Sequence, residues 1–230
     1  MNTVHAVIAV KNLGLAKSRL ADRLHPRDRP RLVLAMLADT VTAAAATPGI
    51  GSVTVVTPDP IVTEVISGLG AHVQPEPEGP AAGGLNAALA AGAAAVRRRH
   101  GPVDLLALQA DLPALRPGEL AEVLAAARHR RCLVADHEGT GTVALLVRDG
   151  SAPLRPLFGP DSARRHIAAG AVELLGEWPG LRQDVDTAAD LDRAAALGVG
   201  ITTGKLLDEI GVSQACRATK EIRRAGSSVC

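Results

Sequence analysis

Three aspartates of this 230-residue chain have the type and placement to bind a divalent cation. Asp111 directly follows an apolar run, residues 103–110, that is typical of a buried parallel strand, and ligands bind beyond the carboxyl ends of such strands. Asp184 and Asp186 are separated by one apolar residue, so in an extended segment both side chains could meet Asp111. Clustered carboxylates repel unless cations lie between them, and their hard oxygen atoms favour Mg²⁺. Alternatively, Asp184 and Asp186 only form a turn and a helix cap.

Three cations follow the first apolar run of the chain: Lys11, Lys17 and Arg19. The loop after the first strand is where mononucleotide-binding sheets place phosphates, which these side chains and the backbone N–H groups would bind. The spacing matches neither the P-loop nor the glycine motif of dinucleotide-binding folds. A solvated loop that leads into an amphipathic helix is an equal alternative.

Two segments in the second half combine glycine with hydroxyl side chains: residues 139–142 (Gly-Thr-Gly-Thr) and residues 159–162 (Gly-Pro-Asp-Ser). The second opens a predicted helix, where free N–H groups and the helix dipole favour an anion. A hairpin turn and an ordinary helix cap are the alternatives for these segments. Asn86 opens another predicted helix, and it could reach a base or ribose or act as a capping residue.

Histidine and cysteine form no recognisable catalytic pattern. Arg164, Arg165 and His166 follow the second glycine segment and could be only the exposed face of its helix. The other histidines form no ligand cluster, and neither a Ser-His-Asp arrangement nor a Cys-His nucleophile is evident from order or spacing. The three cysteines share no metal-ligand spacing, which is typical of a reducing compartment.

Strand-like and helix-like segments alternate through the first half of the chain. Strands are predicted at 4–10, 53–57, 71–74 and 103–110. Helices are predicted at 28–46, 85–99 and 117–129, and a further short helix follows the second strand and ends at Gly70. The second half is expected to hold a hairpin (132–135 and 142–147), a helix opened by 158–162, a strand (172–175) and a last core helix (188–197) with Thr187 or Asp186 as N-cap. This order predicts an α/β fold with a parallel, doubly wound sheet. We expect one domain, residues 1–200, and an appended tail, residues 201–230, that is loosely packed or disordered.

The composition is that of a soluble globular protein, with 47% hydrophobic and 21% charged residues. A formal net charge of +1 and an aromatic content of 1% argue against a nucleic-acid or membrane-surface partner. No stretch of about 20 apolar residues is free of charges or helix breakers. The N-terminus lacks the charged leader and apolar segment of a signal peptide. We therefore expect a cytoplasmic protein.

Taken together, the motifs resemble those of one family, from about Val4 to Gly200 and in the family's order. They are Ala9-Val10-Lys11, Ala16-Lys17-Ser18-Arg19-Leu20, Leu85-Asn86, Asp111-Leu112-Pro113, Gly139-Thr140-Gly141-Thr142, Phe158-Gly159-Pro160-Asp161-Ser162 and Asp184-Val185-Asp186-Thr187. Each motif alone is weak, but their succession is specific. The chain is similar to the phosphoenolpyruvate / 2-phospho-L-lactate guanylyltransferases of deazaflavin coenzyme biosynthesis.

The resemblance implies a nucleotidyltransferase fold, a Rossmann-like, GT-A-like three-layer sandwich with a mostly parallel sheet. It also implies that two Mg²⁺ ions are held by Asp111, Asp184 and Asp186, and that the acceptor is bound by Thr142, Gly159 and Ser162. The nucleotide would be contacted by Lys11, Lys17, Arg19 and Asn86. The catalytic residues would be Asp111 and Lys17. The glycine-rich signature that the wider superfamily carries after its first strand is absent here.

The expected reaction is the transfer of GMP from GTP to the phosphate of a small three-carbon acid, with release of pyrophosphate. The bacterial-looking, Arg- and Ala-rich composition favours phosphoenolpyruvate over 2-phospho-L-lactate. Alternatives are another acceptor, such as molybdopterin or 3-phosphoglycerate, and a non-catalytic nucleotide-binding module. The expected partners are GTP and the phosphorylated acid, without nucleic acid or membrane, and a homodimer is left open.

Overall fold

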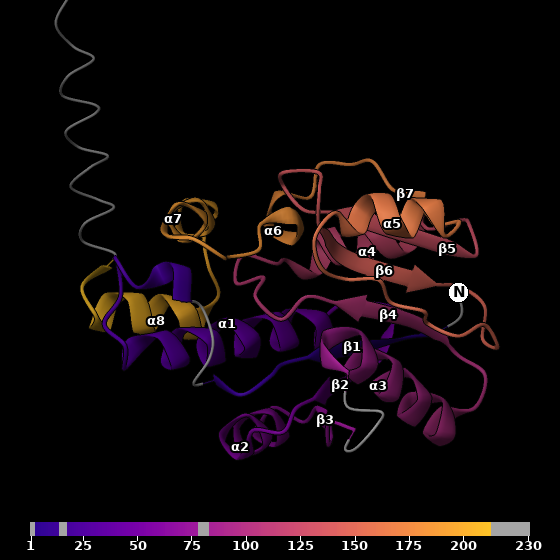
Figure 1. Ribbon diagram of the computed structural model, residues 1–230, viewed down its shortest axis with the longest axis horizontal. Helices are drawn as coiled ribbons and strands as arrows, with labels where there is room; N and C mark the ends of the chain where they lie inside the picture. The colour runs from indigo at the N-terminus through magenta and orange to yellow at the C-terminus, as the bar shows by residue number, and fades with distance from the viewer. Residues whose placement is uncertain (1–2, 14–17, 78–82, 213–230) are drawn as a thin grey trace, which may run out of the picture.

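The computed structural model describes residues 3–13, 18–77 and 83–212, which build a seven-stranded sheet with helices on both faces (Figure 1). The strands are β1 (Val4–Ala9), β2 (Ile50–Val56), β3 (His72–Gln74), β4 (Asp104–Leu108), β5 (Arg131–Ala135), β6 (Thr142–Val147) and β7 (Val172–Glu173). The helices are α1 (Asp28–Ala45), α2 (Pro60–Gly68), α3 (Gly84–His100), α4 (Pro117–Ala126), α5 (Ser162–Ala168), α6 (Pro179–Arg182), α7 (Ala188–Leu197) and α8 (Ile201–Glu209), with a 3-10 helix, η2 (Ser18–Leu20). Among the described helices, none combines the length and the apolar character needed to span a bilayer.

The strand order is β3-β2-β1-β4-β6-β5-β7. Strands β1 to β4 pair in parallel, as do β5 and β7, whereas β6 is antiparallel to both β4 and β5. The predicted α/β class and mostly parallel sheet are confirmed. The predicted β5–β6 hairpin is also present, but its second strand lies beside β4, inside the sheet. Every residue of β6 is buried, as an interior strand requires.

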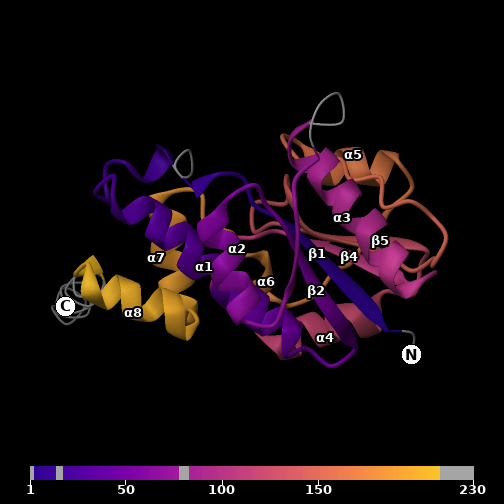
Figure 2. The same ribbon diagram turned by 90° about the horizontal axis from the view of Figure 1, so that it is seen from below.

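Successive residues of the strands are buried on opposite faces of the sheet. In β1, Ala6 and Ile8 join a large core with α1, α2, α4, α7 and α8, whereas Val7 joins a smaller core with α3 and α5. In Figure 2, α3 and α5 lie to the right of β1 and β2, and α1, α2 and α8 lie to their left. A Cβ at Gly92 would lie 2.6 Å from side-chain carbons of Val7 and Val56, so this glycine allows the close approach of α3 to the sheet.

Helix α8 corrects the expectation of an appended tail for residues 201–212. Its residues Thr203, Leu206 and Leu207 are buried, and the two leucines belong to the large core. The buried carboxylate of Asp39 on α1 accepts the backbone N–H groups of Thr202 and Thr203 at 3.0 and 2.7 Å, so it caps α8 from another helix. Residues 213–230, the rest of the expected tail, lie outside the described residues.

Replacing Asp39 with alanine is expected to destabilise the protein by about 1–3 kcal/mol, because two N–H groups at the start of α8 lose their acceptor. The melting temperature should then fall by roughly 2–4 °C per kcal/mol. Thermal unfolding checks this, with the exposed Asp208→Ala on α8 as the control. Equal melting temperatures for the two variants would refute the capping role.

Candidate active site

The carboxyl ends of β4 and β5 and the beginning of β6 meet at one edge of the sheet. The Gln109 N–H donates to the Val143 carbonyl at 2.9 Å, and Thr142 pairs with Ala135. Because β6 runs antiparallel to its neighbours, its first residue, Thr142, lies at the edge where β4 and β5 end. The chain leaves β4 toward Asp111 at this edge. The sheet therefore brings a predicted metal ligand and a predicted acceptor-binding residue to neighbouring positions.

Asp184 is the electrostatic centre of a group of carboxylates at this edge. Burial, together with the negative charges of Asp111, Asp186 and Asp136, raises the pKa of Asp184 to about 7. Asp111 and Asp186 are thus each close enough to Asp184 for their negative charge to act on it. Asp136 is a fourth carboxylate that the sequence argument missed. Its signal was its position directly after β5, which matches the position of Asp111 just beyond β4.

Asp136 also shapes the turn between β5 and β6. Its two carboxylate oxygens accept the N–H groups of Thr140 and Gly141 at 3.0 and 2.8 Å. A Cβ on Gly141 would lie 2.2 Å from the Asp136 carboxylate, so the tight turn requires glycine there. The Thr140 carbonyl in turn accepts the N–H of Ala163 on α5. Asp136 therefore links the charged edge of the sheet to the first turn of α5.

The segment that carries Asp184 and Asp186 is held by the start of α7. Thr187 is the N-cap of α7 and forms a capping box with Asp190, as the sequence predicted for Thr187. The Asp190 carboxylate also accepts the N–H of Asp186 at 3.2 Å. Since Thr187 performs the capping, the structure does not support the alternative in which Asp186 is the helix cap.

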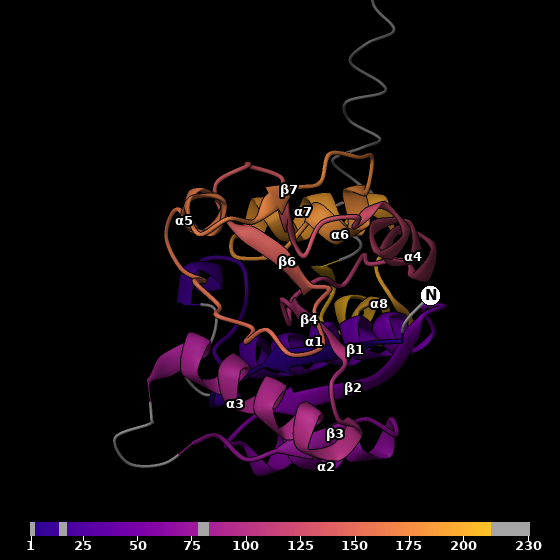
Figure 3. The same ribbon diagram turned by 90° about the vertical axis from the view of Figure 1, so that its right-hand side faces the viewer.

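A histidine that the sequence argument passed over lies next to Asp184. His137 Nδ1 is 3.8 Å from an Asp184 carboxylate oxygen. On its other side, His137 Nε2 lies 2.8 Å from Nη2 of Arg193, which also pairs with Asp190. In Figures 1 and 3, α5 lies near β7 and α6 lies between α4 and α7, in agreement with the contacts among these elements.

The donor chemistry of the carboxylates fits Mg²⁺, but the described residues contain no ready-made metal cage. No group of three or more His, Cys, Asp or Glu side chains in that part of the chain is arranged to hold an ion. Magnesium in nucleotide-processing enzymes is bound by one or two carboxylates and by substrate phosphates, and it keeps several waters. A cluster that is close enough to raise the pKa of Asp184, yet open, suits that mode of binding.

The predicted acceptor-binding residues Thr142 and Ser162 lie together. The Ser162 hydroxyl donates to Thr142 Oγ1 at 3.1 Å, and both side chains are buried. Gly159 precedes Ser162 by three residues with φ +123°, and its backbone is exposed. Arg165 Nη2 lies 3.1 Å from where a Cβ would stand on Gly159. His166, expected on an exposed helix face, is instead fully buried against Thr142, with Nδ1 3.0 Å from Thr142 Oγ1.

Asn86 has a different contact from the one its sequence position suggested. Its side-chain amide donates to the Phe158 carbonyl at 3.0 Å, and its side-chain oxygen accepts the Phe158 N–H at 2.8 Å. The amide group is thus paired with the backbone just before Gly159. It does not cap α3, whose N-cap is Gly83, and it holds the loop before Gly159 through these two bonds.

The predicted nucleotide-binding cations differ in how far the structure describes them. Lys11 is exposed after β1, and its Nζ lies 3.8 Å from where a Cβ would stand on Gly84, at the start of α3. Arg19 is exposed in η2, whereas Lys17 lies outside the described residues. The loop after Lys11 is anchored because the Leu13 N–H donates to Asp59, the N-cap of α2, at 3.1 Å.

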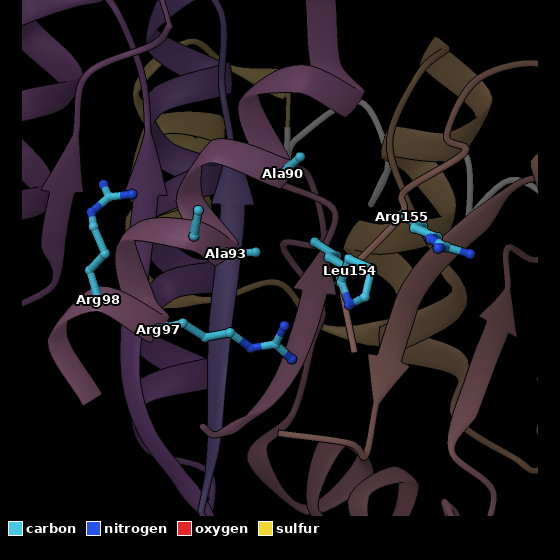
Figure 4. Close-up of a pocket in the computed structure, with 8 residues that line it drawn as sticks. Ala90, Ala93, Arg97, Arg98, Leu154 and Arg155 are labelled. Carbon is cyan, nitrogen blue, oxygen red and sulfur yellow. The ribbon is translucent and has the colours of Figure 1, made fainter. Parts of the chain in front are cut away.

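A separate cavity of about 580 Å³ lies between α3 and the segment 153–155 (Figure 4). Its floor includes Ala90, Ala93 and Leu154, and its rim carries arginines, among them Arg97 and Arg155. It contains none of the predicted site residues. Arg97 donates to the Asp149 carbonyl at 2.9 Å, so at least this arginine has a structural contact.

The chain is similar to one protein family, to curated proteins and to solved structures. The family model "Guanylyl transferase CofC like" matches residues 4–227. The phosphoenolpyruvate guanylyltransferase of Nocardia farcinica is 67% identical over 97% of this chain and 98% of its own, and that of Rhodococcus opacus is 52% identical over 90% of each. A solved nucleotidyl transferase from Methanothermobacter has a TM-score of 0.58 at 21% identity, covering 86% of this chain and 98% of its own. A Desulfovibrio desulfuricans structure, described as a nucleotide-diphospho-sugar transferase, has a TM-score of 0.70 at 14% identity, covering 92% and 96%.

The chain matches these two solved structures over 86% and 92% of its length, which places it in the nucleotidyltransferase fold class. The match to the family model covers nearly the whole chain, so the protein belongs to the CofC-like guanylyl transferases. The family inferred from the sequence motifs is confirmed. Its match extends to residue 227, so the expectation that the resemblance ends at Gly200 is wrong.

Proposed function

We propose that this protein transfers GMP from GTP to the phosphate of phosphoenolpyruvate and releases pyrophosphate. The observation that carries the proposal is the arrangement of one sheet edge. Asp136, whose charge acts on Asp184, directly follows the last residue of β5, and that residue pairs with Thr142 of the buried Thr142–Ser162 hydroxyl pair. The carboxylates suit the cation that accompanies a nucleoside triphosphate, and the hydroxyl groups suit a second anion. Two anionic reactants can therefore be held side by side.

The choice of phosphoenolpyruvate follows the curated relatives. The Nocardia farcinica and Rhodococcus opacus proteins are both named phosphoenolpyruvate guanylyltransferase, at 67% and 52% identity. At such identity over almost the full chain, a shared acceptor is the simplest inference. The runner-up is 2-phospho-L-lactate, which differs from phosphoenolpyruvate only in lacking the carbon–carbon double bond. The product would be guanosine diphosphate capped by the three-carbon acid, an intermediate of deazaflavin coenzyme biosynthesis.

We assign the magnesium-binding role to Asp111, Asp184 and Asp186. When bound, Mg²⁺ neutralises phosphate charge and orients the attacking and leaving oxygens. Asp184 is suited to this task because it is held in a mostly buried position among like charges. Among these carboxylates, that of Asp184 is therefore the one whose ionised form a bound cation would stabilise most. Asp136 stays outside this set, because both of its oxygens hold the β5–β6 turn.

The reaction needs positioning more than proton transfer. An oxygen of the acceptor phosphate attacks the α-phosphorus of GTP in line, and pyrophosphate leaves. The attacking oxygen is already anionic at neutral pH, so no general base is required. The chain's own residues bind and orient the two anions: Thr142, Gly159 and Ser162 on the acceptor side, and Lys11, Lys17 and Arg19 on the side of the GTP phosphates. Asn86 positions the acceptor loop through Phe158.

Pyrophosphate release from GTP in the presence of Mg²⁺ tests the proposal. Phosphoenolpyruvate, 2-phospho-L-lactate, 3-phosphoglycerate and molybdopterin are supplied in turn, and the highest kcat/KM is expected with phosphoenolpyruvate. A preference for another acceptor of the panel would replace the substrate but keep the reaction class. Tight GTP binding without turnover on any acceptor would instead favour a non-catalytic nucleotide-binding module.

A further inference from the structure

A buried chain of hydrogen bonds leads from the backbone of Leu157 to the hydroxyl pair of the acceptor side. The Leu157 N–H donates to Nε2 of His166 at 2.8 Å. Nδ1 of the same ring lies 3.0 Å from Thr142 Oγ1, to which the Ser162 hydroxyl also donates. The residues Thr142, Ser162 and His166 are 2%, 2% and 0% exposed, so bulk water has little access to these bonds.

The backbone bond fixes which ring nitrogen of His166 carries the proton. A backbone N–H is only a donor, so Nε2 must supply a lone pair, and in the neutral ring the proton then resides on Nδ1. Nδ1–H therefore donates to Thr142 Oγ1, and the ring also has a hydrogen bond with the backbone of Ser162. With Ser162 as its second donor, Thr142 has both lone pairs engaged, and its own proton must point elsewhere. If the two hydroxyls exchange roles, the Ser162 proton points out instead. In both cases the series of hydrogen bonds that begins at Leu157 leaves one hydroxyl proton of the Thr142–Ser162 pair available as a donor.

We propose that His166 is a positioning residue that makes the Thr142–Ser162 pair a hydrogen-bond donor toward the anionic group of the acceptor. This inference rests on the proposed function, because the acceptor supplies the anion. A neutral hydroxyl could otherwise face the site with a lone pair, which repels a phosphate or carboxylate oxygen. The imidazole removes that option by occupying the lone pair with Nδ1–H.

The surroundings keep the His166 ring neutral and oriented. Burial, followed by the positive charges of Arg131 and Arg165, lowers the pKa of His166 to about 4. At neutral pH the ring therefore keeps the lone pair on Nε2 that Leu157 requires. Phe158 packs edge-on against it, with ring centroids 5.2 Å apart, which restrains its rotation. The loop that holds Phe158 is in turn tied to Asn86.

Three substitutions of His166 separate this role from a structural one. An asparagine amide reaches as far as Nδ1, so His166→Asn retains a donor for Thr142. A glutamine amide reaches as far as Nε2, so His166→Gln retains an acceptor for the Leu157 N–H. His166→Phe removes both bonds and keeps the volume. We expect His166→Gln and His166→Phe to raise KM for phosphoenolpyruvate about tenfold or more, and His166→Asn to stay within about threefold of wild type. KM for GTP should not change.

A double-mutant cycle with Thr142→Val tests whether His166 acts through Thr142. In the valine background, His166→Phe should have almost no further effect on KM for phosphoenolpyruvate, because the hydroxyl that it orients is absent. Undiminished additivity would overturn the proposal. So would near wild-type KM for His166→Gln together with an impaired His166→Asn, since that pattern means that only the Leu157 bond matters.

The tautomer can be measured without any substrate. Nitrogen-15 NMR of the imidazole of His166 in the wild-type protein should show a protonated Nδ1 and an unprotonated Nε2 at neutral pH. A ring protonated on Nε2 would overturn the proposal whatever the enzyme does. If wild-type protein releases no pyrophosphate with phosphoenolpyruvate, the proposed function fails instead, and the two failures are thus distinguishable.

Discussion

Replacing Asp111 with asparagine is expected to lower the rate of pyrophosphate release at least about a hundredfold. The amide keeps the shape of the side chain but removes the charge that would help to hold Mg²⁺ against the phosphates. The protein should remain folded, because the substitution removes one of the negative charges that act on Asp184. Steady-state kinetics with GTP and phosphoenolpyruvate, together with thermal unfolding, measure both effects.

The matched control for Asp111→Asn is Asp192→Asn, the same chemical change on α7. Asp192 is 45% exposed and pairs with Arg23 at 3.3 Å, so losing its charge should cost at most about 1 kcal/mol and leave turnover unchanged. If Asp111→Asn retains turnover within a few fold of Asp192→Asn, Asp111 has no part in the reaction. A loss of turnover accompanied by unfolding would argue against the charge effect that we expect.

The sequence predicted well those elements whose signals are local. The β-α alternation of the first half, the β5–β6 hairpin and α7 follow from apolar runs, turn residues and helical spacing, and the structure contains them all. The capping box of Thr187 and Asp190 was readable for the same reason, since both partners lie within one turn. Asp111 was readable as a site residue because it lies just beyond β4, at the carboxyl edge of the sheet. Asp184 follows α6 rather than a strand, so its approach to Asp111 was expected only from its spacing with Asp186.

Features that depend on distant partners were missed. Nothing in the sequence near β6 shows that it inserts between β4 and β5, because its fully apolar character fits any interior position. Helix α8 was overlooked because the acceptor for its first N–H groups, Asp39, lies on α1. Asp39 precedes its partner Thr202 by 163 positions in the sequence. A search for local helix caps cannot find such a partner.

The acceptor side of the site shows the same limitation at the level of single residues. His166 follows two arginines in a polar run, so its pattern indicates a surface helix. Its burial arises only because α5 lies against β5 and the start of β6, where Thr142 offers a hydroxyl partner. Asn86 likewise meets Phe158, 72 positions away, through the tertiary fold. The sequence thus grouped Thr142 with Ser162, which are in contact in the structure, but it did not show the bonds that orient them.

Replacing Asp184 with asparagine is expected to abolish turnover and yet stabilise the metal-free protein above neutral pH. Burial and like charges raise the pKa of the Asp184 carboxyl from 3.8 to about 7 in the folded state. The folded protein therefore holds this proton more tightly than the unfolded chain does. The associated stability is fully present below about pH 4 and is lost as pH rises through about 7, by at most about 4 kcal/mol.

Asparagine stays neutral, so the variant escapes this loss. In EDTA, the melting temperature of Asp184→Asn relative to wild type should rise between pH 5 and pH 8, because only the wild type acquires a buried, repelled charge. Adding Mg²⁺ at pH 8 should then stabilise the wild type more than the variant, since the ion binds the ionised carboxylate. The half-exposed Asp192→Asn provides the baseline for a carboxylate-to-amide change. A constant difference in melting temperature across that pH range would mean that the pKa of Asp184 is not raised. The carboxylate group would then no longer be supported as a cation-binding site.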